Sequence, residues 1–344
     1  MINKSILIAY KNLVSSKNSQ KIDTFINYAS AFFKTPTSTH PLEIQVEPSA
    51  VCNLKCKMCS LDKSTSKIKF LTPDNLLLII KKFKASSINL TGMGETLLNP
   101  YFEQLLKVCF DQKIKTSFIT NIQLLNSKHL EAIKKYPPTN ISISMESGFS
   151  RKYNQIRLGA NLRITTKKIQ ELLKFIRKNS LPTQVSINIV FLDFNLKELK
   201  HVYKIIDLAS LIGISKITSQ NINRLSPYIR GLYLSHRIET KFNQIKNYSK
   251  KSNIEIILPS TKLSSGKCYY PWVYPQITAT GEILPCCVIP QFGTYDYIVK
   301  KYSFGNIINN SLNKSWNSKL AQNFRKRHQS SSPCRYCSKN CGVL

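Results

Sequence analysis

The chain has no long hydrophobic run. Nowhere in its 344 residues do about eighteen apolar residues follow one another, the length that a membrane-spanning helix needs. The first twenty residues, MINKSILIAYKNLVSSKNSQ, hold only a short apolar patch with no small-residue cleavage site after it, so they do not match an export signal. We therefore expect a cytoplasmic protein without a membrane span.

Acidic residues are also scarce. The 18 Asp and Glu residues face 50 Lys and Arg residues, so the formal net charge at pH 7 is +32. A strongly basic surface is the usual footprint of phosphate binding. Only ten of the basic residues are arginine, however, and the lysines are spread along the whole chain among many asparagines and isoleucines. Because arginine is the residue favoured for bidentate phosphate contacts, this pattern favours solvated surface lysines over a nucleic-acid partner.

Histidine is sparse, with 5 residues, whereas cysteine is abundant, with 10. In a chain without an export signal we do not expect a disulfide framework, because the cytosol keeps thiols reduced. Cys109 follows Phe102, Leu105 and Leu106 at helical spacing, so we expect it in the core. The other cysteines form an early and a late group, which indicates metal binding or catalysis: Cys52, Cys56 and Cys59, then Cys268, Cys286, Cys287, Cys334, Cys337 and Cys341.

A hydrophobic content of 42% is ordinary for a globular chain, and 344 residues can form one large domain and a small one. Beyond residue 40, short strand-like segments regularly precede helical ones. Thr72 before Pro73 and Asn99 before Pro100 mark two of the helix starts. Six strand–helix units with short connections predict an α/β fold with a parallel sheet, as a barrel or part of one. The expected strands are residues 41–48, 86–93, 115–122, 139–146, 184–191 and 215–222.

This organisation predicts four regions. Residues 1–40 form an N-terminal extension with some helical character, residues 41–225 form the strand–helix core, and residues 226–266 form a bridge with one short strand, IEIILP. Residues 267–344 form a separate, small cysteine-rich module. In a TIM-like arrangement, functional residues lie at the C-terminal ends of the strands. The three cysteines after the first strand are therefore expected at the rim of the active site.

The loop CNLKCKMC places three residues between Cys52 and Cys56 and two between Cys56 and Cys59. Three thiolates on a four-iron cube leave one iron without a protein ligand, and that position can bind a substrate or cofactor. A structural zinc site is one alternative, but zinc would need a fourth cysteine or histidine, and the nearest histidine, His40, precedes the strand. Incidental cysteines are the other alternative.

The same loop resembles the CxxxCxxC signature of the radical S-adenosylmethionine (SAM) superfamily. Its neighbours agree, because TGMGETLLNP is similar to the family's Gly-Gly-Glu segment and TN resembles its Thr-Asn-Gly. ISISMESG and NQIRLGANL resemble the family's strand near the ribose and its Ile-Arg-Gly-Gly-Ala turn. The sequence departs from the pattern at Met93, Thr96 and Ile122, where glycine, proline and glycine are usual. The resemblance covers about residues 41–225 and implies a partial (β/α)6 TIM-like barrel of the radical SAM type.

By this resemblance, Cys52, Cys56 and Cys59 would bind a [4Fe-4S] cluster whose open iron holds SAM. An external electron donor of the flavodoxin or ferredoxin type would allow SAM to be cleaved to a 5′-deoxyadenosyl radical, which removes a hydrogen atom from a substrate carbon. The protein would supply aim and exclude water. The sequence identifies no catalytic acid or base. The residues expected to approach SAM are Gly92, Met93, Gly94, Glu95, Asn121, Ser142, Ser144 and Asn188, of which the last three also fit an ordinary polar lining of the barrel.

The late cysteines resemble a second iron–sulfur motif. Twelve residues separate Cys268 from Gly281 and four separate Gly281 from Cys286, as in the CX9-15GX4C element of SPASM and twitch modules. The glycine permits a hairpin turn that brings both thiolates to one site. Because the chain ends three residues after Cys341, we expect one auxiliary [4Fe-4S] cluster, with Cys287 as a packed neighbour. A zinc ribbon is the alternative. By the resemblance, the cluster's ligands would be Cys268, Cys286, Cys334 and Cys337, with Cys341 as a competitor or spare.

These motifs predict a radical SAM oxidoreductase. We expect it to oxidise (dehydrogenate) or rearrange a small metabolite such as a sugar-like alcohol, because one auxiliary cluster suits removal of a second electron. Peptide maturation, as in the wider SPASM group, is the main alternative. Enzymes of that group often carry a peptide-binding winged domain, for which residues 1–40 are too short. RNA modification fits only the charge, and a non-catalytic metal-binding module is the remaining alternative.

Overall fold

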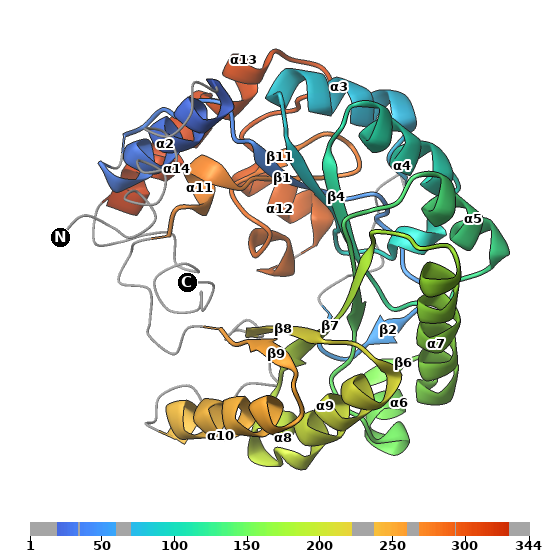
Figure 1. Cartoon of the computed structure of the whole chain (residues 1–344). Coiled ribbons are helices and arrows are strands. Elements are labelled where there is room, and N and C mark those ends of the chain that lie inside the picture. Colours follow the sequence, from blue (N-terminus) through green and yellow to red (C-terminus); the bar gives the residue numbers. More distant parts are fainter. Residues whose placement is uncertain are drawn as a thin grey trace.

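The computed structural model describes residues 19–33, 35–59, 70–221, 237–259, 268–292 and 294–329. Its centre is one curved sheet in the order β11-β10-β1-β3-β4-β5-β7-β8-β9. Figure 1 shows this sheet as the inner wall of an open ring, with helices outside it. The strands are β1 (Glu43–Val46), β3 (Ser87–Leu90), β4 (Lys115–Thr120), β5 (Asn140–Ser144), β7 (Gln184–Phe191), β8 (Lys216–Asn221), β9 (Glu255–Ile257), β10 (Gln276–Ile277) and β11 (Ile283–Leu284).

The six strands expected from the sequence are all present. They are β1, β3, β4, β5, β7 and β8, and each pairs in parallel with the next one. Parallel neighbours require crossover connections, and these are supplied by the helices between the strands. The fold is therefore the predicted partial (β/α)6 barrel, which does not close.

The sheet extends beyond the six predicted strands at both edges. The short strand expected in the bridge is β9, and it pairs in parallel with β8. At the other edge, β10 pairs in parallel with β1, and β11 continues antiparallel to β10. The first hairpin of the predicted C-terminal module joins the core sheet. Residues 276–284 belong to the core sheet, because the edge of β1 bonds to them: Glu47 N donates to Ile277 O at 2.8 Å.

Helices cover the outer side of the sheet, as Figure 1 shows for α3, α4, α5 and α7. Within the described ranges, no helix combines the length and the apolar character needed to cross a membrane. The helices are α2 (Ser19–Phe32), α3 (Pro73–Phe83), α4 (Phe102–Asp111), α5 (Ser127–Lys135), α6 (Ser150–Ile156), α7 (Leu162–Lys178), α8 (Asp193–Lys197), α9 (Lys200–Ile212), α10 (Arg237–Lys251), α11 (Tyr270–Val273), α12 (Tyr295–Tyr302), α13 (Leu312–Trp316) and α14 (Lys319–Gln329), with 3-10 turns η1 (Thr96–Leu98) and η2 (Ile289–Phe292).

The two predicted helix starts have different outcomes. Thr72 caps α3 as expected, because its side chain accepts a hydrogen bond from Asn75 N at 3.3 Å. The prediction for Asn99 is wrong, since α4 begins at Phe102. The Asn99 amide instead donates to Pro48 O at 2.7 Å and to the carbonyl oxygen of residue 71 at 3.0 Å. It is buried and fastens the chain after β3 to the chain after β1.

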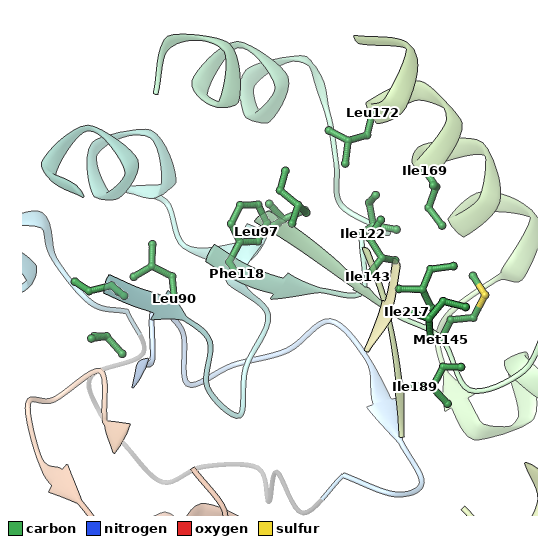
Figure 2. Packing of buried hydrophobic residues seen from close by; sticks show 14 of the residues in the cluster. Leu90, Leu97, Phe118, Ile122, Ile143, Met145, Ile169, Leu172, Ile189 and Ile217 are labelled. Carbon is green, nitrogen blue, oxygen red and sulfur yellow. The ribbon is translucent and has the colours of Figure 1, made fainter. Parts of the chain in front are cut away.

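The hydrophobic core lies between the sheet and the outer helices. Alternate residues of the strands face the helices, whereas the residues between them face the inside of the ring. Cys109 of α4 is in this core and is 1% exposed, as predicted. Figure 2 shows strand residues of this core: Ile143, Ile189 and Ile217 lie on the side of α7, which carries Ile169 and Leu172, whereas Leu90 and Phe118 lie farther along the sheet.

The N-terminal segment is fastened to the C-terminal region. Helix α2 lies beside α11 and α14 in Figure 1, and the rings of Tyr28 and Tyr269 are 6.1 Å apart. Ser38 Oγ donates to Trp272 O at 2.9 Å, and Asn317 Nδ2 donates to Ser38 O at 3.0 Å. The first and last elements of the described chain therefore form one packed unit against the β1 edge of the sheet.

Candidate active site

The three-cysteine loop leaves β1 at the C-terminal edge of the sheet. Cys56 belongs to the short strand β2 (Lys55–Cys56), which pairs antiparallel with β6 (Arg157–Leu158). Cys59 N donates to Cys56 O at 3.0 Å, so the loop turns back on itself. Cys52 and Cys56 are partly buried and Cys59 is exposed. The loop thus places two thiols against the protein and one toward solvent.

Two of these sulfurs receive hydrogen bonds from the protein. Leu54 N donates to Cys52 Sγ at 3.4 Å, and Asn121 Nδ2 approaches the same sulfur at 3.9 Å. Arg157 Nη1 donates to Cys56 Sγ at 3.9 Å. Burial raises the pKa of Cys52 to about 11 and that of Cys56 to about 12. Both thiols are therefore protonated at neutral pH, and a metal that binds them must displace their protons.

Arg157 and Glu146 form a buried ion pair beside Cys56. Arg157 Nε donates to Glu146 Oε2 at 2.5 Å, and Nη2 donates to Oε1 at 2.7 Å, a bidentate contact. The residues are 7% and 0% exposed. The Glu146 charge raises the pKa of Arg157 although burial opposes this. The sequence alone assigns no role to either residue. Two features of the sequence could have identified them: the arginine within the segment NQIRLGANL, and the glutamate at the end of the expected strand 139–146.

The glycine segment after β3 packs directly against the cysteine loop. Gly94 N donates to Ser49 O at 3.1 Å, and Glu95 N donates to Val51 O at 2.9 Å. A Cβ atom at Gly94 would lie 2.2 Å from Ser49 O and 2.5 Å from Val51 O, so only glycine fits. The two segments predicted to hold the cluster and SAM are thus joined through their backbones.

Glu95 is buried, and its carboxylate joins the ends of β3 and β4. Thr120 Oγ1 donates to Oε1 at 2.5 Å, Leu97 N donates to Oε1 at 3.1 Å, and Asn121 N donates to Oε2 at 2.8 Å. Burial raises the pKa of Glu95, and these donors oppose the rise. Its charge also raises the pKa of Cys52, so the carboxylate is near the cysteine loop. Glu95 therefore holds Asn121 in place beside that loop.

The segment after β4 makes a tight turn next to the cysteines. Asn121 Nδ2 donates to Asn53 Oδ1 at 2.9 Å, which places its amide against the cysteine loop. Ile122 has φ of 61°, in the left-handed region that a β-branched residue rarely adopts. Its side chain is nevertheless fully buried in the core. This backbone explains why the resembling family has glycine here, and packing of the isoleucine compensates for the strain.

Glu47 is a further buried carboxylate, and no sequence motif singles it out. Met93 N donates to Glu47 Oε1 at 2.9 Å, and Ala279 N donates to Oε2 at 3.3 Å. Burial raises its pKa to about 6, and the two backbone donors oppose the rise. A Cβ atom at Gly92 would lie 2.3 Å from Glu47 Cγ. Glu47 therefore links the glycine segment to the β10–β11 hairpin, a contact across more than two hundred residues that sequence spacing does not reveal.

The three remaining predicted SAM contacts lie on the inner face of the ring. Ser142 and Ser144 share one face of β5, as predicted, and pair in register with Ser186 and Asn188 of β7. Ser186 Oγ donates to Ser142 Oγ at 3.1 Å, and the Thr218 hydroxyl donates to Asn188 Oδ1 at 3.2 Å. The structure brings these side chains together across the strands. The hydrogen-bond partners of Ser142 and Asn188 are Ser186 and Thr218, side chains of neighbouring strands, which also suits a polar barrel lining.

One register level of the inner face carries only amide or hydroxyl side chains. The residues at this level face away from the helices, because side chains alternate along a strand and the next residues on β1, β3 and β4 are in the core. These core residues are Val46, Leu90 and Phe118. Amide and hydroxyl groups both donate and accept hydrogen bonds, so this surface suits a neutral polar ligand. The paired residues, from β10 to β7, are Gln276, Gln45, Asn89, Ser117, Asn140 and Gln184.

The first two late cysteines flank the β10–β11 hairpin. Its turn contains Gly281 with φ of 88°, as the motif requires. Cys268 and Cys286 are each 7% exposed, and Cys287 is partly buried. Cys286 belongs to a small buried cluster against which Tyr270 and Cys287 pack, and burial raises the pKa of Tyr270. Cys334, Cys337 and Cys341 lie outside the described residues.

The number and type of the donors suit iron–sulfur clusters, whereas within the described ranges no three His, Cys, Asp or Glu side chains are gathered closely enough to hold a single metal ion. Three thiols on one loop can ligate three corners of a cube and leave the fourth open. The glycine segment beside them packs against Glu47 and against the backbone of the cysteine loop, where a side chain would collide, so the segment is held next to that loop. The pair of late cysteines near Tyr270 is a partial second set. The arrangement can therefore hold a redox-active metal group at the rim of the barrel, above a polar inner face.

Two family models match the chain. The radical SAM superfamily matches residues 46–206, and an iron-sulfur cluster-binding domain of the SPASM type matches residues 268–342. The first match contains the early cysteines and the glycine segment, and the second contains the cysteines of the hairpin. Together they cover both groups of cysteines identified in the sequence.

Several named proteins and several solved structures are similar to this chain. The "antilisterial bacteriocin subtilosin biosynthesis protein AlbA" of Bacillus subtilis is 22% identical over 333 residues, which are 90% of this chain and 68% of AlbA. A "probable GTP 3′,8-cyclase" of Methanococcus maripaludis is 24% identical over 127 residues, 36% of this chain and 42% of that protein. Streptococcus suis SuiB, solved with S-adenosylmethionine, has a TM-score of 0.70 at 18% identity, covering 96% of this chain and 81% of SuiB. The protein anSMEcpe, solved with AdoMet, has a TM-score of 0.62 at 16% identity, covering 88% and 89%.

Proposed function

Because the chain is a radical SAM superfamily member with a C-terminal SPASM iron–sulfur domain, we propose that it removes a hydrogen atom from a carbon of a peptide substrate and so modifies that peptide. The two domains imply a [4Fe-4S] cluster, SAM and auxiliary iron–sulfur binding. When bound, the cluster and SAM supply a carbon-centred radical that abstracts hydrogen. The chain's own residues hold these groups and aim them.

The observation that carries the proposal is the joined pair of loops at the rim. Cys52, Cys56 and Cys59 would bind the cluster, and Gly94 N bonds the neighbouring segment to the cysteine loop at Ser49 O. Residues of that neighbouring segment and the strands beside it would orient SAM, namely Gly92, Met93, Gly94, Glu95, Asn121, Ser142, Ser144 and Asn188. The bound groups would thus lie over the polar inner face, where a substrate can enter.

Relatives support a peptide as the substrate. AlbA is named for bacteriocin biosynthesis, and SuiB has been solved bound to its precursor peptide SuiA with a TM-score of 0.69 to this chain. Structures of anSMEcpe include complexes with AdoMet and a peptide. The polar inner face is compatible with the amides of a peptide. It is also compatible with alcohols, so the preference for a peptide in this proposal rests on the relatives and not on this surface.

The small-metabolite prediction is the second candidate. AlbA, SuiB and anSMEcpe give no support to a sugar-like alcohol, and dehydrogenation of such a substrate stays a prediction from the sequence. RNA modification and a non-catalytic role also stay alternatives, without a specific observation in their favour. An external electron donor of the flavodoxin or ferredoxin type belongs to either enzymatic proposal, because a cluster must be reduced before SAM is cleaved.

The test is an anaerobic assay of the reconstituted chain with SAM and dithionite. The substrates offered are short peptides encoded beside its gene, with a panel of sugar-like alcohols as the comparison. The proposal expects 5′-deoxyadenosine to form and a peptide to change in mass by loss of hydrogen. An altered alcohol with every peptide unchanged would contradict the peptide assignment and favour the second candidate. No 5′-deoxyadenosine under any condition would contradict catalysis altogether.

A further inference from the structure

We propose that the Glu146–Arg157 ion pair sets the reduction potential of the cluster held by Cys52, Cys56 and Cys59. The positive charge of Arg157 would stabilise the reduced cluster, and the negative charge of Glu146 would destabilise it. The two residues would therefore shift the reduction potential in opposite directions. This inference rests on the proposed cluster site, and it assigns a role to two residues outside the cysteine loop.

The backbone brings Arg157 to the cysteine loop. Strands β2 and β6 pair antiparallel, and Arg157 lies directly opposite Cys56 in their register. Its side chain continues this approach, since Nη1 donates to Cys56 Sγ at 3.9 Å. Lys57 N also donates to Ile156 O at 2.8 Å, which extends the connection by one residue. The arginine is therefore fixed next to a predicted ligand by main chain as well as side chain.

Glu146 fixes which edge of the guanidinium faces the sulfur. Its carboxylate occupies Nε at 2.5 Å and Nη2 at 2.7 Å, which leaves Nη1 for Cys56. Glu146 is itself held, because Asn195 Nδ2 donates to its backbone oxygen at 3.2 Å and to Val190 O at 3.0 Å. A planar guanidinium held on two atoms cannot rotate its third nitrogen away from the sulfur.

Burial makes these charges effective. Both side chains are almost fully excluded from water, and charges interact more strongly in a medium of low dielectric. A reduced cluster carries one more negative charge than an oxidised one, so a nearby hydrogen bond or positive charge raises its potential.

The two roles, electrostatic and structural, predict different results. A pair that serves only to hold the fold would lose stability when either partner is removed, and the cluster would respond in the same direction to both changes. A pair that tunes the cluster gives shifts of opposite sign. Removing Glu146 leaves a buried positive charge, whereas removing Arg157 leaves a buried negative charge and withdraws a donor from Cys56.

The experiment is a redox titration followed by EPR on the full-length reconstituted chain. The signal of this cluster is identified by its change when SAM is added. We expect Glu146→Gln to shift the potential upward, Arg157→Met to shift it downward, and the double variant to lie closer to the parent than either. Glu103→Gln removes the solvent-exposed ion pair between Glu103 of α4 and Lys135 of α5, and serves as the control without a shift.

Unchanged potentials, or shifts of the same sign in both single variants, would overturn the inference. If Arg157→Met fails to hold the cluster, Arg157→Lys keeps the positive charge and should hold the cluster at a potential close to that of the parent, while Glu146→Gln still shifts the potential upward. An unshifted potential in Glu146→Gln would then overturn the inference. Failure of the proposed function is a separate result, because the parent itself would then show no signal that responds to SAM.

Discussion

Gly94 is the residue at which the site tolerates least change. Its position is determined by two carbonyl oxygens of the cysteine loop, at distances where a Cβ atom would overlap them. Backbone oxygens cannot move aside as the end of a flexible side chain can. The consequence is that the geometry of the loop depends on a residue that is not itself a metal ligand.

We predict that Gly94→Ala pushes the glycine segment away from the cysteine loop and breaks the bond from Gly94 N to Ser49 O. Iron bound after anaerobic reconstitution should fall severalfold, with an unfolding free energy lower by about 1–3 kcal/mol. Ser210→Ala, at an exposed position of α9, is the control. Full iron loading and parental stability in Gly94→Ala would show that the close contact does not constrain the site.

Glu47 makes stability depend on pH. Burial raises its pKa from 4.5 to about 6, so the folded chain holds a proton over a range in which the unfolded chain has lost it. The contribution of the protonated Glu47 to the free energy of unfolding is therefore fully present below about pH 4.5 and is lost as the pH rises through about 6. The shift corresponds to about 2 kcal/mol. Glu95, whose pKa is also raised, acts in the same direction.

Urea unfolding of the parent and of Glu47→Gln at several pH values between 4 and 7 isolates this effect. Stability of Glu47→Gln relative to the parent should rise by about 2 kcal/mol over that range, because glutamine does not ionise. Other acidic groups are common to both proteins and cancel in the difference. A difference that does not vary with pH would contradict the assignment.

At the scale of elements, the C-terminal helices anchor the N-terminal segment to the barrel. Trp316 at the end of α13 is 1% exposed, and its indole N–H donates to Thr39 O at 2.9 Å. Its ring packs against Phe83 of α3 and Phe304, and Arg325 of α14 lies 4.3 Å from it in a cation–π contact. One side chain therefore connects α3, α13, α14 and the chain before β1.

We predict that Trp316→Ala lowers the free energy of unfolding by about 3–5 kcal/mol, the usual cost of emptying a buried tryptophan site. Leu320→Ala provides a matched truncation, because Leu320 is 58% exposed on α14. It should change stability by less than about 0.5 kcal/mol. Equal effects from the two truncations, measured by chemical denaturation, would show that α13 is not a structural anchor.

Local elements could be predicted from the sequence because their signals are local. Thr72 caps α3 by a hydrogen bond from Asn75 N, only three residues along the chain, and all six predicted strands form. The prediction for Asn99 failed because α4 begins only at Phe102: the Asn99 side-chain oxygen accepts a hydrogen bond from Tyr101 N at 2.7 Å, and its amide nitrogen donates to Pro48 O, fifty-one residues away. The same limit applies to the site. The cysteine spacing is visible in the sequence, whereas the partners of Glu47 and Arg157 are created by strand pairing.

At the scale of the whole molecule, the early cysteines and the two late cysteines Cys268 and Cys286 lie beside strands of one continuous sheet. The early group follows β1, and the hairpin between Cys268 and Cys286 adds β10 and β11 to the same edge. A change at one group therefore reaches the other through shared strands, and separate roles must be tested by separate variants.

We predict that Cys268→Ala with Cys286→Ala lowers iron content but leaves cleavage of SAM within a few fold of the parent. The reason is that the proposed site of cleavage uses only the early cysteines. The double variant should no longer form an oxidised product, meaning a substrate with a new carbonyl or double bond. Forming such a bond requires removal of a second electron from the substrate. Thermal stability measured on the same sample separates this from unfolding of the hairpin. Full turnover to product at normal stability would contradict an electron-accepting role.

The central claim is that the early cysteine loop carries the radical chemistry, and 5′-deoxyadenosine formation measures it most directly. Reduced, reconstituted parent chain should produce 5′-deoxyadenosine from SAM, and Cys109→Ala, in the core of α4, should do the same. The triple variant Cys52→Ala, Cys56→Ala, Cys59→Ala should lose about four irons per chain and all production. Continued production of 5′-deoxyadenosine by the folded triple variant would contradict the account.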